Sequence, residues 1–288
     1  MKRSFGERIF SIFNYFLLIV LAVVTLYPFL YVVFASVSEP AKLLLTNGFL
    51  LKPAGFTWAA YESVFAEASL FSGYANTIFY TVAGTALNML ATVIAAYVLS
   101  REQLMLRRFF TLMFLFTMYF SGGMIPNYLL MQDLHLINTR WAVLLPGLVS
   151  TYNMLIMIRG FYSVPASLEE SARIDGASHW RVLFSIILPL AKPTAMVIMM
   201  YYAVGHWNAW YNAMLYIRDI SKRPLQLYLR KILILNQIAV VNGDSAADEV
   251  GMTVQFATII VAVVPILVIY PFIQKHFVSG IMLGAVKG

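Results

Sequence analysis

Six long runs of apolar residues, separated by more polar connections, dominate the hydrophobic pattern of the chain. A run of about 18 or more apolar residues predicts a helix that spans a membrane. The runs cover residues 9–35, 71–99, 109–131, 141–158, 186–211 and 252–273. We therefore expect an all-α, polytopic membrane protein with six transmembrane helices.

The first run follows a basic N-terminus, as the apolar core of a secretory signal peptide does. Its length, and the Pro28 within it, set it apart from a signal peptide, whose apolar core has about 7–15 residues. We expect this segment to be retained as a transmembrane helix.

Composition supports the membrane assignment and excludes several kinds of site. The 288 residues are 61% hydrophobic and 11% charged, whereas about a quarter of an ordinary globular protein is charged. The chain has no cysteine, and its four histidines show no metal-binding spacing, so we expect neither disulfides nor a metal site. We attribute the net charge of +7 to loops that face anionic lipid, and not to nucleic-acid binding.

Basic residues in short connections indicate which side of the membrane is cytoplasmic. One side carries Lys2, Arg3, Arg8, Arg101, Arg107, Arg108, Arg159, Arg173, Arg181, Lys275 and Lys287; the other carries Lys42, Lys52 and Arg140. We expect both termini and a loop at residues 162–185 to be cytoplasmic. The extracellular connection at residues 212–251 contradicts the count with five basic residues, although long connections follow the rule less closely.

Part of that long connection, residues 224–235, mixes apolar and basic residues at helical spacing. Two interpretations stay open for it. It is either an amphipathic helix in the lipid headgroup layer or a segment that contacts an external partner or its ligand. A turn is expected at residues 242–245.

The six runs contain no Asp or Glu, and Lys192 and His206 are their only basic titratable residues. A transporter driven by an ion gradient would normally need an acidic or ion-coordinating site within the membrane. The chain also lacks a phosphate-binding Walker loop and a hydrolase motif, so we do not expect it to be an enzyme. Energy for any transport would then come from another subunit.

The loop at residues 162–185 contains the most specific pattern. Ser167 and Glu170 have the spacing of a capping box, which predicts a short helix that begins there and ends at Gly176, where a left-handed conformation is tolerated. A helix this short is not stable alone and must dock on something.

Glu170-Ser171-Ala172, Gly176 and the element at residues 186–189 together resemble the EAA loop of ABC importer permeases, with Ser171 in place of the usual Ala. The C-terminal segment 277–288 is similar to the carbohydrate branch that includes the maltose importer. Residues 207–219 and the connection after them resemble permeases for complex oligosaccharides and polysaccharide fragments.

The resemblance implies a type I importer permease fold, formed by one transmembrane domain over residues 1–288, in the bacterial cytoplasmic membrane. It implies a second homologous permease, two cytoplasmic ATPase subunits that hold ATP and Mg, and an extracellular solute-binding protein that delivers a carbohydrate. The coupling residues that it implies are Glu169, Glu170, Ser171, Ala172, Asp175, Gly176 and Pro189, and the ATPase-contacting tail residues are Gly284, Val286, Lys287 and Gly288.

Sugars are bound by aromatic faces and by amide and hydroxyl groups. Residues of these types in the fourth and fifth runs are Tyr152, Asn153, Trp207, Asn208, Trp210, Tyr211 and Asn212. The aromatic residues also fit an interfacial belt, and buried amides such as Asn76 and Asn88 also fit interhelical hydrogen bonds.

Three other functions stay open. They are an ABC importer for an amino acid, phosphate or peptide, a gradient-driven facilitator, and a membrane scaffold without a pathway. A facilitator has no use for an ATPase-docking helix, so the loop around Glu170 favours the importer.

Overall fold

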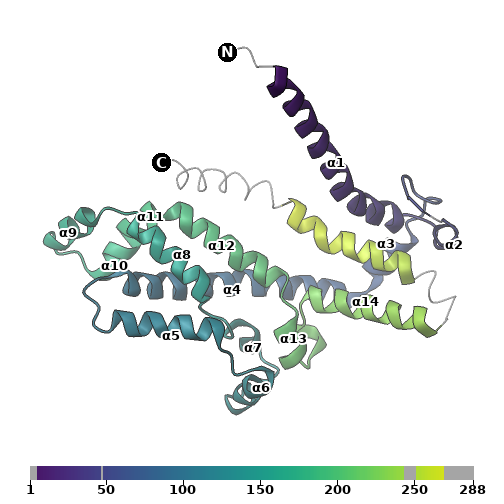
Figure 1. Ribbon diagram of the computed structural model, residues 1–288. Coiled ribbons are helices and arrows are strands. Elements are labelled where there is room, and N and C mark those ends of the chain that lie inside the picture. Colours follow the sequence, from purple (N-terminus) through teal and green to yellow (C-terminus); the bar gives the residue numbers. More distant parts are fainter. Residues whose placement is uncertain (1–4, 47, 243–250, 269–288) are drawn as a thin grey trace. The chain divides into compact units, whose positions relative to one another are not determined.

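The computed structural model describes residues 5–46, 48–242 and 251–268 (Figure 1). This part of the chain is helical and contains no β-strand; a single antiparallel bridge joins Ser38 and Phe56. The prediction of an all-α protein is confirmed for these residues. The chain forms two compact units, residues 1–68 with 229–265, and residues 69–228 with 266–288.

The first unit contains the long apolar helix α1 (Phe5–Ser36), the short helices α2 (Pro40–Leu44) and α3 (Ala59–Ala66), and a helix over residues 251–268. Its small core forms where the end of α1 meets the following loop, around Ala35 and Leu43. The rings of Tyr31 and Phe256 meet edge to face at 5.8 Å between centroids. Most of α1 is exposed and apolar, as expected for a helix that faces lipid or another chain.

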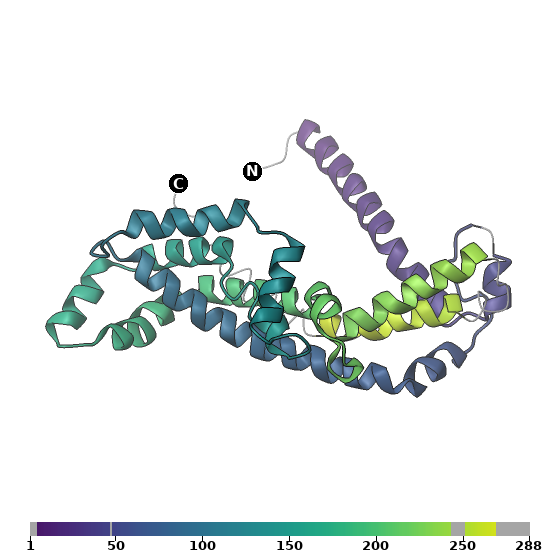
Figure 2. The same ribbon diagram turned by 90° about the horizontal axis from the view of Figure 1, so that it is seen from below.

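The second unit is built along α4 (Ala68–Ser100) (Figures 1 and 2). The elements that follow are α5 (Arg107–Tyr119), α6 (Met124–Asp133), α7 (Trp141–Leu144), α8 (Thr151–Tyr162), α9 (Ala166–Ile174), α10 (His179–Val182), the π-helical turn η1 (Leu183–Ile187), α11 (Leu188–Leu190), α12 (Lys192–Trp207), α13 (Tyr211–Tyr216), η2 (Ile220–Lys222) and the start of α14 (Leu225–Asn242).

The core of this unit lies between α4, α8, η1 and α12. Ala96, Met154, Phe161, Leu183 and Ile198 are almost fully buried in it. Both views show α9 and α10 at the end of the unit, beyond the last turn of α4 (Figures 1 and 2). The core therefore holds α4, α8 and α12 together and presents the loop around α9 at one end.

Two of the predicted spans are bent. Residues 109–131 form α5 and α6, which meet at 114° around Gly123, where φ is +87°. Most of residues 186–211 belong to two helical segments that meet at 88° at Ala191, two residues before Pro193. Three described helices are long and apolar enough to cross a membrane, and five are if each bent pair is one span.

The predicted span at residues 141–158 is divided in the structure. Helices α7 and α8 are separated by residues 145–150, which contain Pro146 and Gly147 with φ +77°. A new helix starts after Ser150, whose hydroxyl accepts a hydrogen bond from the Asn153 amide. Hydropathy follows the apolar character of the stretch and does not detect this interruption.

In the long connection, the helix expected over residues 224–235 is present as the first part of α14. The Leu225 amide donates to the Thr77 hydroxyl at 2.8 Å, and a Cβ on Gly73 would lie 3.2 Å from the Leu225 Cα. A close approach to α4 at Gly73 therefore positions the start of α14. The turn expected at residues 242–245 falls almost wholly outside the described residues.

Candidate functional site

The N-terminal end of α9 differs from the prediction. The helix begins at Ala166 after Pro165, whose extended backbone makes it the N-cap, and no side chain caps the first turn. Ser167 is consequently the second helical residue and cannot act as N-cap. The capping box predicted from Ser167 and Glu170 is therefore wrong, although a short helix does form there.

The C-terminal end of α9 agrees with the prediction. Gly176 has φ +77°, its amide donates to the Arg173 carbonyl at 3.0 Å, and the Ala177 amide donates to the Ala172 carbonyl at 2.9 Å. These two bonds form a Schellman motif, which satisfies the last carbonyls of a helix. A Cβ at position 176 would meet no atom within 4 Å, so only the left-handed backbone requires glycine.

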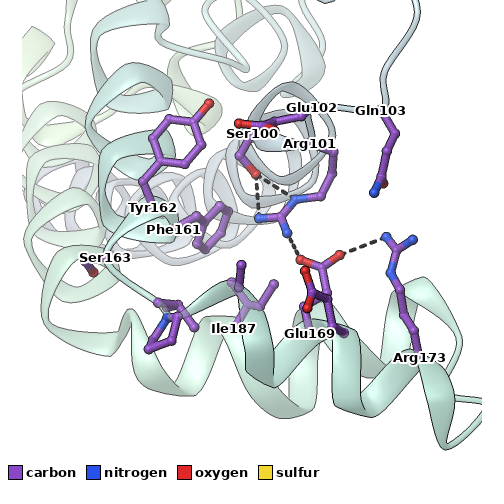
Figure 3. Close-up of a pocket in the computed structure, with 14 residues that line it drawn as sticks. Ser100, Arg101, Glu102, Gln103, Phe161, Tyr162, Ser163, Glu169, Arg173 and Ile187 are labelled. Atoms are coloured by element: carbon purple, nitrogen blue, oxygen red, sulfur yellow. Dashed lines mark hydrogen bonds and ion pairs between the residues drawn. The ribbon is translucent and has the colours of Figure 1, made fainter.

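Glu169 lies at the centre of an ionic network that fixes α9 to the end of α4 (Figure 3). Its carboxylate accepts a hydrogen bond from Arg173 at 2.8 Å and forms an ion pair with Arg101. The Arg101 guanidinium also donates to the Ser100 hydroxyl, at 3.1 and 2.9 Å, and lies 4.8 Å from the centre of the Tyr97 ring. Burial lowers the pKa of Arg101.

A cavity of about 400 Å³ adjoins this network (Figure 3). It is lined by the end of α4, the segment from Phe161 to Ala166, and the inner residues of α9. Two further acids, Glu102 and Glu170, line it and are exposed to solvent. Glu169 is thus engaged within this chain, whereas Glu170 is accessible to another molecule.

The other predicted coupling residues share the same end of the unit. Ser171 and Asp175 are exposed on α9, and Pro189 is exposed within α11. Ala172 packs partly buried against the core. The predicted tail residues Gly284, Val286, Lys287 and Gly288 lie outside the described residues.

A second cavity, of about 340 Å³, lies where α12 ends and α13 begins. Four of the seven residues predicted to contact a sugar line it: Asn208, Trp210, Tyr211 and Asn212. The other three do not line it. Trp207 and Asn153 are buried, and Tyr152 is exposed elsewhere on α8.

Two hydrogen-bonding residues of this cavity, Asn88 and His206, were not predicted as site residues. The His206 Nε2 lies 2.5 Å from the Asn88 Oδ1, and the Asn88 amide donates to the carbonyls of Gly147 and Leu148 at 3.0 and 2.7 Å. Asn88 thus joins α4 to α12 and to the break before α8, which agrees with its interpretation as a structural hydrogen-bonding residue. The only sequence signal for Asn88 was an amide side chain within an apolar run.

Two of the five basic residues that contradict the charge rule, Lys222 and Arg223, have structural partners. Lys222 contacts the Asp219 carboxylate at 3.4 Å and the Asn138 carbonyl at 3.2 Å. The Arg223 guanidinium donates to the carbonyls of Ile217 and Arg218. These two charges therefore stabilise a loop, which gives them a role independent of membrane orientation.

Comparisons with known proteins identify the family of the chain. The family model described as "Binding-protein-dependent transport system inner membrane component" matches residues 103–283. The chain is 39% identical to Protein LplC of Bacillus subtilis, covering 100% of this chain and 98% of the relative. It is 38% identical to the polygalacturonan/rhamnogalacturonan transport system permease protein YtcP of the same organism, over 98% and 99% of the two chains.

A solved structure is similar over almost the whole chain. It belongs to a bacterial ABC transporter involved in the import of the acidic polysaccharide alginate, with a TM-score of 0.87, 35% identity, and coverage of 96% of this chain and 99% of that one. The match of sequence and fold leads to one conclusion: this chain belongs to the family of binding-protein-dependent transport system inner membrane components.

Proposed function

We propose that this chain is the membrane-spanning subunit of an ATP-driven importer for oligosaccharides. Residues 1–288 would form one permease domain with six spans in the bacterial cytoplasmic membrane, with both termini in the cytoplasm. An extracellular solute-binding protein would deliver the sugar, and a second homologous permease would complete the pathway. The observation that carries the proposal is α9. This helix ends in a Schellman motif, is fixed at one end of the unit, and has part of its surface exposed.

The exposed surface of α9 suits a docking role. Ile174 is 87% exposed and Leu168 is 42% exposed, and the acidic Glu170 stands between them along the helix. Exposed apolar side chains beside a charge are typical of a protein interface. We propose that two cytoplasmic ATPase subunits bind ATP and Mg and hydrolyse the ATP, and that one of them contacts this surface together with the tail residues Gly284, Val286, Lys287 and Gly288.

The cavity beside α13 is our candidate for the sugar pathway. The Trp210 and Tyr211 rings meet edge to face at 5.7 Å between centroids, and Asn208 and Asn212 supply amide groups at the same cavity. Aromatic faces cover the apolar C–H surface of a sugar while amides exchange hydrogen bonds with its hydroxyls. One relative is named as a polygalacturonan/rhamnogalacturonan transport permease, and the similar solved structure belongs to an alginate importer. These names support polysaccharide fragments as the class of substrate.

The first test is purification of the detergent-solubilised full chain from its native membrane. We expect an ATPase and a second permease to accompany it. With the solute-binding protein added, we expect the purified complex to take up oligogalacturonides into liposomes only when ATP is hydrolysed. Recovery of the chain alone, with uptake that does not depend on ATP, would show that the protein is a facilitator and not a subunit of an ATP-driven importer. ATP-driven uptake of amino acids or phosphate but not of oligosaccharides would overturn the substrate class.

The coupling role is tested by Glu170→Gln, with Glu102→Gln as the matched control. Both acids are exposed at the same cavity, but only Glu170 lies on α9. We expect Glu170→Gln to lower uptake by about fivefold or more, the lower end of typical coupling effects, and Glu102→Gln to leave it unchanged. Equal uptake by both variants would contradict the docking surface.

A further inference from the structure

The ionic network around Glu169 connects α9 to the end of α4, two elements that are distant in the sequence. Its three charged members come from α9 and from the residue directly after α4, the longest helix of the unit. The side chains of Glu169 and Arg101 are 11% and 19% exposed. This burial distinguishes the pair from an ordinary surface ion pair, which contributes little and is screened by salt.

The two arginines of the network attach Glu169 to different helices. Arg101 is held against the last turn of α4 by the Ser100 hydroxyl and the Tyr97 ring, so its guanidinium moves with that helix. Arg173 extends the contact to α10, because its guanidinium lies 3.3 Å from the His179 Nδ1. Removal of one partner from a buried ion pair leaves a charge without compensation, so the structure resists separation of α9 from α4.

We propose that Arg101, acting through Glu169, is a positioning residue that transmits movement of α9 to α4. The inference rests on the proposed function, because it presumes that an ATPase moves α9. It assigns different roles to the two adjacent acids: Glu170 faces outward to the partner, and Glu169 faces inward to the membrane helix. Rigid-body movement of α9 then displaces the end of α4 without a change in the membrane core.

The experiment uses the complete importer in liposomes, with uptake and ATP hydrolysis measured together. We expect Arg101→Gln to retain the ATPase on purification and to hydrolyse ATP at nearly the native rate, while uptake per ATP falls about tenfold in both Arg101→Gln and Glu169→Gln. Arg101→Lys keeps a positive charge and should restore part of the ratio. Arg108→Gln is the matched control, because Arg108 is an exposed arginine in the first turn of α5, seven residues after Arg101.

A second variant makes the result independent of folding defects. The native chain contains no cysteine, so Arg101→Cys with Glu169→Cys introduces two unique thiols. A short thiol-reactive cross-linker should raise the lowered uptake per ATP back towards the native ratio, because it replaces the ionic link by a covalent one. A purely structural role for either residue would not respond to the cross-link.

Four outcomes separate the proposals. Native uptake per ATP in Arg101→Gln would overturn the link, and so would a cross-linked cysteine pair that stays uncoupled. An unmodified complex that shows no ATP-driven uptake would instead overturn the proposed function itself. A fall in uptake that Arg108→Gln shares would show a general effect of charge and would also overturn the link.

Discussion

Gly160 allows α8 to approach α12 closely, and its replacement by alanine should force the two helices apart. A Cβ at position 160 would lie 2.7 Å from the Thr194 Cγ2 and 2.8 Å from the Thr194 Cβ. Carbon atoms pack best about 3.5–4.0 Å apart, so the helices would have to separate by roughly 1 Å. Thr194 is branched at Cβ and cannot move aside by rotation of a distant group.

The size of the effect follows from two opposing contributions. Overpacking of a close contact costs about 1–3 kcal/mol. Alanine regains up to about 1 kcal/mol over glycine within a helix. We therefore expect Gly160→Ala to lower the free energy of unfolding by up to about 2 kcal/mol, from the same two contributions.

Unfolding of the detergent-solubilised complex, followed by tryptophan fluorescence, measures this difference. Gly205→Ala is the matched control, since Gly205 lies in α12 and a Cβ there would meet no atom within 4 Å. It should leave stability unchanged or raise it slightly. Thr194→Ala combined with Gly160→Ala should recover part of the loss, because it removes the Thr194 Cγ2 and Oγ1 but keeps the Cβ that lies 2.8 Å away.

The reasoning would be refuted by a Gly160→Ala protein as stable as the Gly205→Ala protein. It would also fail if Thr194→Ala did not change the cost of Gly160→Ala, because the clash would then lie elsewhere.

Three further predictions concern the end of α9, the cavity beside α13 and the loop at Asp219. Gly176→Ala should cost about 1–2 kcal/mol of local stability through its left-handed backbone and reduce co-purification of the ATPase, while Gly176→Asn should do so less. Asn88→Leu leaves two carbonyls without their donor, so we expect the free energy of unfolding to fall by at least about 1 kcal/mol, and unchanged denaturant unfolding would contradict this. Hydrogen bonds from Ser221 lower the pKa of Asp219, so its contribution to the loop is present above the unfolded pKa and is lost as pH falls through the folded pKa. Hydrogen exchange of the Ser221 amide should accelerate over that acidic range, and Asp219→Asn should abolish the pH dependence.

Local features of the chain could be predicted because local chemistry determines them. An apolar run long enough to cross a bilayer is favourable as a helix, since no water is present to satisfy backbone groups. The left-handed position at Gly176 depends only on the backbone at the end of α9. For these reasons the all-α character and the C-terminal end of α9 could be predicted from the sequence. The N-terminal end could not, because Pro165 became the N-cap in place of the predicted Ser167.

The tertiary structure alone decided which of these elements bend and which side chains meet. Hydropathy is insensitive to the bends near Gly123 and Ala191, because the two helices on either side of each bend are together apolar enough to count as one span. The two adjacent acids of α9 are chemically alike in the sequence, and only the packing of α9 on the end of α4 buries Glu169 against Arg101 and leaves Glu170 exposed. A contact between distant segments leaves no local periodicity, so its partners emerge only when the helices pack.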